Sequence, residues 1–552
     1  MARKAEMKQD SVGSEINTEV IRRWRRWSIK GNDSLPHHVY HFDRSVCTSP
    51  IFVWDSEGIA PSTMAASMED SIQVSLVRPD PSDSALKPIH LFHPIFTYPI
   101  FGEEERIFGY QGLDINIRFA AHDCRPHVAI NYEKKFPKVG DVRPTDCTKI
   151  LKEYMPPVAF ENTYDSTVTQ DFSARSWTPP GEVIHTYKRN GRTFEVWSGS
   201  LSDTNVRFLL DQIQIFVLLF IEGGQMLVLD DPEWTLNRWQ VYFIYEKTQV
   251  PDQPNVSPYV LAGYATTYRC YKMTIPASRP TKSGLESFPD VEVIDPTLQD
   301  CRLRVSQVLV LPPFQANGHG SELFRIIYKR VMNDNSICEL TVEDPSEEFD
   351  KLRDSHDWKV LEPVFRAANI TINTSAVASQ TRYDKFPKKK LLDLPKLEKM
   401  RKEHKISPRQ FYRALELYFL SQIPYSRRAA GGASLTKLLV RKHRSSDPVD
   451  VKYYWLRNLI KNRIWLQNSD KLVNVPRDEV VEKVSDSTRA QEDEYEGYLL
   501  NFAAKAAGDL NGAGLVVGSS AGGAARKRKI IDDDDDDEGA VSDASKKARS
   551  AR

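Results

Sequence analysis

The sequence has few of the features that mark a disulfide-stabilised or metal-binding protein. Its 552 residues include only six cysteines, which lie far apart without a CxxC pair or a Cys/His spacing suited to zinc. Such cysteines are typical of reduced, mostly buried thiols in an intracellular protein. The twelve histidines are also scattered. We therefore expect neither a disulfide framework nor a metal site.

Long apolar runs are missing as well. The most apolar stretch, residues 209–220, is interrupted by Asp211, Gln212 and Gln214 and is too short and polar to span a bilayer. Residues 1–14 are charged and lack the apolar core of a signal peptide. The sequence predicts a soluble protein that is not secreted and has no membrane partner.

Neither sign of charge is in excess. Lys+Arg and Asp+Glu both total 75, giving a formal net charge of zero, so no whole-protein field attracts nucleic acid. Residues 22–27 interleave four arginines with two tryptophans, which suits either nucleic acid or a short segment packing its indoles on the domain. We favour the packed segment and expect no direct sequence-specific binding of nucleic acid.

The most informative stretch is residues 304–354. Val305 and the run 308–311 are apolar and rich in β-branched residues, and Pro312 and Pro313 end the run, which predicts a buried strand. The segment QANGHG (315–320) follows, and from Ser321 apolar residues recur at helical spacing. Its glycines and the free N–H groups of a helix start suit a phosphate, although tight strand-to-helix packing is the alternative.

Two acidic residues follow the next strand, which is predicted for residues 338–342. Asp344, with Pro345 and Glu347, fits the N-cap, first-turn proline and capping-box acid of another helix. Glu343 has no such capping role. A carboxylate at a strand end beside an acyl-carrier site can take a proton from an incoming amine, so Glu343 is the first candidate for a general base.

These motifs resemble a known family. Gln-x-x-Gly-x-Gly after a strand that meets a proline pair is similar to the pyrophosphate loop of the GNAT acetyltransferases, whereas the third glycine of a Rossmann fingerprint and the Gly-Lys-Ser/Thr of a P-loop are absent. SQVLVLPPFQANGHG and VEDPSEEFDKLRD together resemble the type B histone acetyltransferase catalytic subunits, with FGYQGL, WQVYFIYEK and GYATTY extending the likeness over residues 40–420.

The resemblance implies roles for particular residues. Acetyl-CoA is the expected co-substrate, and the candidate catalytic carboxylates are Glu343, Asp344 and Glu222, the last expected on a helix before Gly223. The expected coenzyme contacts are Val308, Leu309, Val310, Gln315, Ala316, Asn317, Gly318, His319, Gly320, Ser321, Ser346 and Ser355. The expected contacts with a histone H4 tail are Glu103, Glu104, Glu105, Trp239, Tyr268, Arg269 and Cys270. Family members are more aromatic at positions 269–270, and an arginine facing a basic tail would repel it unless it points away.

The expected fold class is α+β. A polar segment (1–30) precedes a mixed N-terminal histone-binding domain (31–165), a central GNAT fold with a mostly antiparallel sheet (166–375), a small helical domain (376–480) and a disordered, low-complexity tail (481–552). The stretch between Lys272 and Arg304 has no periodicity and is expected to be a surface loop insertion.

These expectations combine into one function and one alternative. The resemblance implies an enzyme that acetylates lysines in the histone H4 tail, with H3 alongside and with a WD40-repeat histone-binding subunit as partner. Basic clusters in the tail suggest a nuclear localisation signal, so nucleus and cytoplasm are both expected. The alternative is a catalytically inactive GNAT-like histone chaperone or scaffold, which an intact cofactor loop and base argue against.

Overall fold

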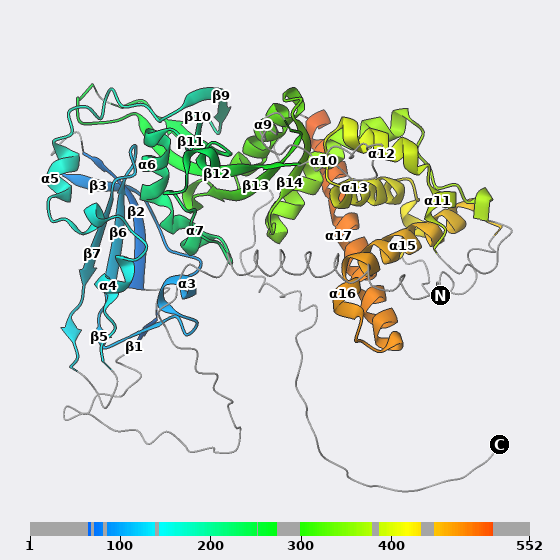
Figure 1. Ribbon diagram of the computed structural model, residues 1–552, viewed down its shortest axis with the longest axis horizontal. Helices are drawn as coiled ribbons and strands as arrows, with labels where there is room; N and C mark the ends of the chain where they lie inside the picture. The colour runs from blue at the N-terminus through cyan, green and yellow to red at the C-terminus, as the bar shows by residue number, and fades with distance from the viewer. Residues whose placement is uncertain are drawn as a thin grey trace, which may run out of the picture.

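The computed structural model describes residues 65–67, 71–80, 85–137, 143–250, 252–272, 299–377, 386–431 and 446–511. Within these ranges an N-terminal mixed sheet, a central curled sheet and a group of C-terminal helices follow one another (Figure 1). The predicted α+β class is confirmed. The arginine- and tryptophan-containing segment 22–27, most of the insertion (273–298) and residues 512–552 lie outside the described residues.

The N-terminal sheet has four strands, with β2 and β6 parallel and the other neighbours antiparallel. In sheet order they are β3 (Leu86–Phe92), β2 (Ile72–Pro79), β6 (Asp114–Ala120) and β7 (Pro126–Asn131). Ile115, Ile117 and Phe119 of β6 are fully buried and alternate along the strand with less buried residues, so one face of this strand lies in the core.

Short elements surround this sheet. They are β1 (Ala65–Ser67) paired with β4 (Arg106–Phe108), β5 (Tyr110–Gln111) paired with β8 (Lys134–Lys135), and the helices α3 (Tyr98–Phe101), α4 (Cys147–Leu151), η2 (Pro157–Phe160) and α5 (Tyr164–Thr169).

The central sheet has six strands and is antiparallel except where β13 meets β14. In order they are β14 (Ile337–Val342), β13 (Cys301–Val310), β12 (Tyr259–Tyr271), β11 (Trp239–Lys247), β10 (Arg192–Ser200) and β9 (Glu182–Arg189). The pairing of β13 with β14 stops at Val305 and Val342, while β13 runs on to Val310. The two strands therefore part halfway along β13.

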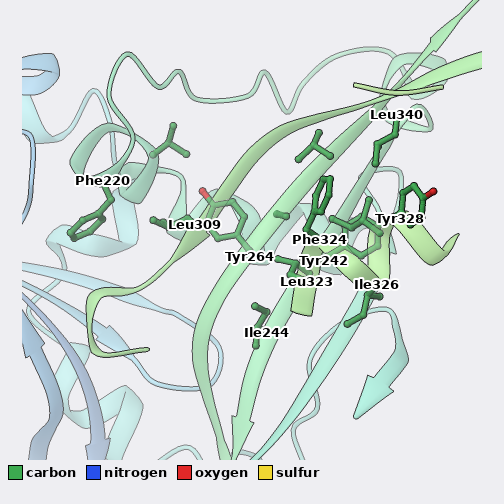
Figure 2. Close-up of a cluster of buried hydrophobic side chains, with 14 of the residues drawn as sticks. Phe220, Tyr242, Ile244, Tyr264, Leu309, Leu323, Phe324, Ile326, Tyr328 and Leu340 are labelled. Carbon is green, nitrogen blue, oxygen red and sulfur yellow. The ribbon is translucent and has the colours of Figure 1, made fainter. Parts of the chain in front are cut away.

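Helices pack on both faces of the central sheet. They are α6 (Thr204–Ile213), α7 (Ile215–Phe220), α8 (Glu233–Leu236), η5 (Pro312–Phe314), α9 (His319–Asn333) and α10 (Glu347–Ala367). Figure 2 shows Leu323 and Phe324 of α9 with Tyr242 on one side of the strands, and Phe220 of α7 with Leu309 on the other. Burial of these side chains fixes α7 and α9, the helices that flank the opening between β13 and β14.

Backbone contacts join the two sheets. The carbonyl of Ala121 accepts a hydrogen bond from the N–H of Leu261 at 2.9 Å, and the carbonyl of His122 accepts one from the Tyr245 hydroxyl at 2.9 Å. One continuous apolar core runs from the N-terminal sheet into the central sheet. The N-terminal domain is therefore held against the face that carries α7.

The C-terminal helices pack against α10. They are η6 (Ser375–Val377), α11 (Lys388–Leu391), α12 (Leu394–Glu403), α13 (Pro408–Ser421), η7 (Tyr425–Arg427), α15 (Pro448–Gln467), α16 (Ser469–Leu472) and α17 (Arg477–Asn511). Pro408 opens α13 after the N-cap residue Ser407, and Phe411, Leu415 and Tyr418 bury one side of this helix.

The predicted disordered tail begins too early. Residues 477–511 form α17, and Tyr495 on this helix is fully buried, so the expectation of disorder from residue 481 is wrong for this stretch. Its acidic side chains pair with arginines from earlier parts of the chain: Glu492 with Arg457 of α15 at 3.0 Å and Glu496 with Arg428, which follows η7, at 2.8 Å. From composition alone these acidic side chains were expected to face solvent, because the arginines that pair with them lie far away in the sequence.

Candidate functional site

The predicted anion loop joins η5 to α9. Ala316 and Gly318 have left-handed backbones, with φ of 58° and 79°, and α9 begins at His319, two residues earlier than the predicted start at Ser321. No side chain caps this helix start. The first N–H groups of a helix have no partner within it, so they point outward at the positive end of the helix dipole. The loop has the donors that a phosphate needs.

The two glycines keep this cradle open. At Gly320 a Cβ would lie 3.2 Å from Leu352 of α10, which is tighter than ordinary contact, and at Gly318 it would point at the guanidinium of Arg189. Gln315, Ala316, Gly318 and Ser321 are exposed, so the loop is accessible from solvent. These residues fit the pyrophosphate of acetyl-CoA.

The side chain of His319 does not face this loop. Only 3% of the residue is exposed, its Nδ1 lies 2.7 Å from the Tyr187 hydroxyl, and its ring packs on Phe194. Burial, followed by the charges of Arg189 and Arg192, lowers the pKa of His319 to about 4. Its predicted coenzyme contact is thus limited to the backbone.

A cavity of about 540 Å³ opens where β13 and β14 part. It brings together the three predicted catalytic carboxylates, from the end of β14 and from the segment after α7. Its lining residues are Ile95, Phe96, Phe220, Ile221, Glu222, Val305, Ser306, Val308, Val342, Glu343, Asp344, Pro345, Ser346, Glu348 and Phe349. The predicted base therefore shares one cavity with Val308 and Ser346 of the predicted coenzyme site.

Glu343 is held by two residues of β13. Its Oε1 lies 3.3 Å from an Arg304 guanidinium nitrogen, and its Oε2 accepts a hydrogen bond of 2.7 Å from the Ser306 hydroxyl. The Glu343 side chain is 43% exposed. The register between β12 and β13 shifts here, leaving Ser306 as an extra residue of a β-bulge. Sequence reasoning missed Arg304 and Ser306, because no local pattern reveals a bulge or which residue it turns towards Glu343.

Asp344 is not the N-cap of α10. The N-cap is Ser346, whose Oγ accepts a hydrogen bond from the N–H of Phe349, while Asp344 has a positive φ of 29°. The helix begins at Glu347, so Pro345 precedes the cap. The predicted capping role of Asp344 was wrong, and its carboxylate lines the cavity instead.

Glu222 follows α7 and is not part of it. The helix ends at Phe220, and Glu222 is exposed at the mouth of the cavity. The N–H of the next residue, Gly223, donates a hydrogen bond of 3.2 Å to the Tyr98 hydroxyl. This contact links the Glu222 segment to α3.

The acidic triplet Glu103, Glu104 and Glu105 lies in the turn after α3, near this link. Its third member has a structural role, because Glu105 Oε1 accepts hydrogen bonds from the N–H and hydroxyl of Thr97 and from the N–H of Tyr98. These bonds lower the pKa of Glu105. Glu103 and Glu104 are exposed, so these two are the ones available to a basic peptide.

The four predicted contacts on the sheet do not share one face. Successive strand residues point to opposite faces, and the register pairs Trp239 with Tyr268 and Tyr268 with Arg304. The Trp239 and Tyr268 rings are 4.6 Å apart, on the face whose Arg304 contacts Glu343, and Cys270 lies two residues further on. Arg269 therefore points to the other face, where it forms an ion pair of 2.5 Å with Asp334. Its expected substrate contact does not fit this placement.

The remaining coenzyme candidates border the same opening. Val308, Leu309 and Val310 lie on β13 beyond its last pair with β14. Ser355 lies about one turn along α10 from Leu352, which approaches the start of α9, and its hydroxyl bonds to the Lys351 carbonyl at 2.8 Å. Of these residues, Val308 also lines the cavity.

One group of possible metal ligands occurs among the described residues. His122, Asp123 and Asp171 have ligand atoms within 4.8 Å of one another, but Arg125 forms ion pairs of 2.6 and 2.9 Å with the two carboxylates. A guanidinium thus already neutralises the pair. Among the helices that the structure describes, none is long and apolar enough to cross a membrane.

Comparison with known proteins identifies the family. Residues 64–222 match the family model described as the histone acetyl transferase HAT1 N-terminus. Histone acetyltransferase type B catalytic subunits match from Aspergillus fumigatus at 43% identity (79% of this chain, 77% of that protein), Aspergillus oryzae at 42% (79% and 86%) and Schizosaccharomyces pombe at 31% (73% and 85%). A solved structure, AtaTR bound with AcCoA, covers 24% of this chain and 63% of that one at 14% identity with a TM-score of 0.13, too low to support an argument.

An enzyme of the acetyltransferase class is thus defined by these relatives together with the splayed sheet and its acidic cavity. The chain belongs to the family of histone acetyltransferase type B catalytic subunits.

Proposed function

We propose that this protein transfers acetyl directly from acetyl-CoA to lysine ε-amines in the N-terminal tail of histone H4, with Glu343 as general base. The observation that carries the proposal is the cavity at the splay, which gathers Glu343, Glu222 and Asp344 next to the strand edge and helix start that suit the coenzyme.

Three parts of the chain would hold acetyl-CoA, which supplies the acetyl group as a thioester. The backbone of residues 308–310 lies beyond the last pair of β13 with β14, where its groups would bond to the amides of the pantetheine arm, although the Val310 carbonyl already accepts a hydrogen bond of 2.9 Å from the Gln315 amide. Residues 315–321 offer N–H groups to the pyrophosphate at the start of α9. Ser346, the N-cap of α10, and Ser355 on α10 would contact the rest of the molecule.

Glu343 would take the proton of the substrate amine. A lysine with an ordinary pKa of about 10.4 is almost entirely protonated at neutral pH and cannot attack a thioester in that form. Arg304 and Ser306 fix the Glu343 carboxylate at the wall of the cavity, and its partial exposure leaves room for an amine or a bridging water. Glu222 and Asp344 add negative charge that attracts the cationic lysine.

The surface around the cavity suits a basic peptide. Glu103 and Glu104 are exposed on the turn linked to the Glu222 segment, while Trp239 and Tyr268 offer aromatic faces on the Glu343 side of the sheet. A lysine or arginine of the peptide would bind over the Trp239 ring, because the guanidinium of Arg238 already lies over the Tyr268 ring, 4.5 Å from its centroid. We infer that the H4 tail lies across these residues, with H3 and a WD40-repeat histone-binding subunit bound elsewhere on the protein.

The direct test is mass spectrometry of an H4 tail peptide after incubation with the protein and acetyl-CoA. We expect a mass increase of one acetyl group per modified lysine, absent when the coenzyme is omitted and strongly reduced in Glu343→Gln. A catalytically inactive histone chaperone would bind the same peptide, by calorimetry, without adding acetyl. That result would refute the enzymatic proposal.

A further inference from the structure

The hairpin between β9 and β10 touches the anion loop from a distant part of the sequence. Its two turn residues, Asn190 and Gly191, both have positive φ, 50° and 75°, as a tight two-residue hairpin requires. The amide of Asn190 donates a hydrogen bond of 2.9 Å to Asn317 Oδ1, and the amide of Asn317 donates one of 3.0 Å to the Gln315 carbonyl. The hairpin turn is thereby fixed to the loop.

Arg189, the last residue of β9, points at the same loop. Its guanidinium carbon lies 3.7 Å from the position that a Cβ on Gly318 would take, and two of its terminal nitrogens lie 3.7 and 3.9 Å from that position. Gly318 precedes the first residue of α9. The positively charged guanidinium of Arg189 therefore lies beside the free N–H groups at the start of α9.

The charge of Arg189 is poorly compensated. The carboxylate paired with it is Glu322, at 3.9 Å, but Glu322 already accepts hydrogen bonds from His185 at 2.9 Å and from Arg325. Within the described residues the Nε of Arg189 is buried without a hydrogen-bond partner. The neighbouring Arg192, in contrast, is paired with Glu246 at 3.1 Å. Arg189 thus has donors to spare where an anion fits.

The surroundings show the same positive potential. The pKa of His319 is lowered, first by burial and then by the charges of Arg189 and Arg192, so its ring stays neutral at physiological pH. A neutral imidazole beside the helix start leaves the anion to the guanidinium and the backbone. A fork of N–H donors matches two phosphate oxygens better than a point charge does.

We propose that Arg189, carried by the β9–β10 hairpin, binds the pyrophosphate of acetyl-CoA from the side opposite the α9 backbone. This rests on the proposed function, since it assigns a further binding residue to the same coenzyme site. The hairpin then acts as a second wall of the anion loop, with Asn190 lying 127 positions earlier in the chain than its partner Asn317 in the loop.

Calorimetric titration of the full chain with acetyl-CoA tests this. Arg189→Gln should weaken binding by about 10- to 100-fold, because it removes charged hydrogen bonds to phosphate. Arg189→Lys keeps the positive charge but not the planar set of guanidinium donors, so its acetyl-CoA affinity should fall less than that of Arg189→Gln. The matched control is Lys188→Gln: it removes one positive charge from the adjacent, exposed residue, which points to the other face of the strand, and should change affinity by less than about fivefold.

Two further measurements make the outcomes separable. With 3′-dephospho acetyl-CoA the loss in Arg189→Gln should be as large as with acetyl-CoA, and the melting temperatures of the uncomplexed variants should match wild type. A loss that disappears with the dephospho coenzyme, or that equals the loss in Lys188→Gln, overturns the pyrophosphate assignment while leaving the proposed function intact. If wild type itself binds no acetyl-CoA, the proposed function fails and the inference fails with it.

Discussion

Replacing Glu343 by Gln is the sharpest test of the chemistry. The amide keeps the shape of the side chain and can still accept the hydrogen bond from Ser306, but it cannot take a proton from the lysine amine. The change also removes the ion pair between Arg304 and Glu343, whose side chains are 45% and 43% exposed, respectively. An ion pair this exposed contributes about 0–1 kcal/mol to stability, so the variant should stay folded.

The expected loss of transition-state stabilisation is far larger than this loss of folding stability. General-base catalysis contributes about 100- to 10,000-fold, which corresponds to roughly 3–5.5 kcal/mol of transition-state stabilisation. The substrate lysine has an ordinary pKa near 10.4, so at pH values below this pKa the neutral fraction of its amine increases about tenfold for each unit by which the pH is raised. The turnover of Glu343→Gln should therefore recover in part as the pH rises, whereas acetyl-CoA affinity should stay nearly unchanged.

Initial rates with an H4 tail peptide, measured across pH for four variants, decide the assignment. Glu347→Gln on the first turn of α10 is the control, since it removes an exposed carboxylate that does not line the cavity. If Glu343→Gln keeps full turnover while Glu222→Gln or Asp344→Asn abolishes it, the base is another member of the trio. If all three variants stay active, solvent must deprotonate the amine, and Glu343 is not the base.

Three further predictions concern the coenzyme loop, the helical domain and pH. Gly318→Val should weaken acetyl-CoA binding in calorimetry while the protein stays folded, because a side chain there strains a backbone with φ of 79° and displaces the phosphate; unchanged affinity would remove the loop from the site. Arg413→Met should lower the free energy of unfolding in urea by about 3–5 kcal/mol, because it leaves the buried Asp354 without its cationic partner. A decrease below about 1 kcal/mol would show that the pair is solvated. In the folded protein the pKa of His319 is lowered from 6.5 to about 4, so between these pH values the unfolded chain binds more protons and the free energy of unfolding falls as the pH drops. His319→Gln should flatten this pH dependence of the free energy of unfolding, measured by urea titration. An unchanged slope would contradict the lowered pKa.

The sequence predicted the elements whose signals are local. Apolar periodicity predicted β13 and α9, because alternation and helical spacing are set within a few residues. Helix boundaries were less accurate. α9 starts at His319 because the left-handed Gly318 already turns the chain into the helix.

What the sequence could not predict depends on residues far apart. Arg269 turned to the opposite face because strand register places it there and Asp334, 65 positions away, binds it. The disordered tail was expected to begin at residue 481, yet α17 continues to residue 511 and its acids Glu492 and Glu496 pair with arginines distant in the sequence. Long-range pairing of this kind leaves no pattern in the local sequence.

The acidic cavity and the coenzyme cleft have a common origin in the way β14 ends. Asp344 has a positive φ and Pro345 has no N–H, so the ladder cannot continue past Val342, while β13 extends five residues beyond Val305, its last residue paired with β14. The same break leaves Glu343 and Asp344 at the opening and leaves residues 306–310 at the β13 edge without a strand partner on the β14 side, where the Gln315 amide bonds to the Val310 carbonyl. A bound pantetheine arm would satisfy that edge as a strand does, which places its thioester end beside the carboxylate that Arg304 and Ser306 hold in position.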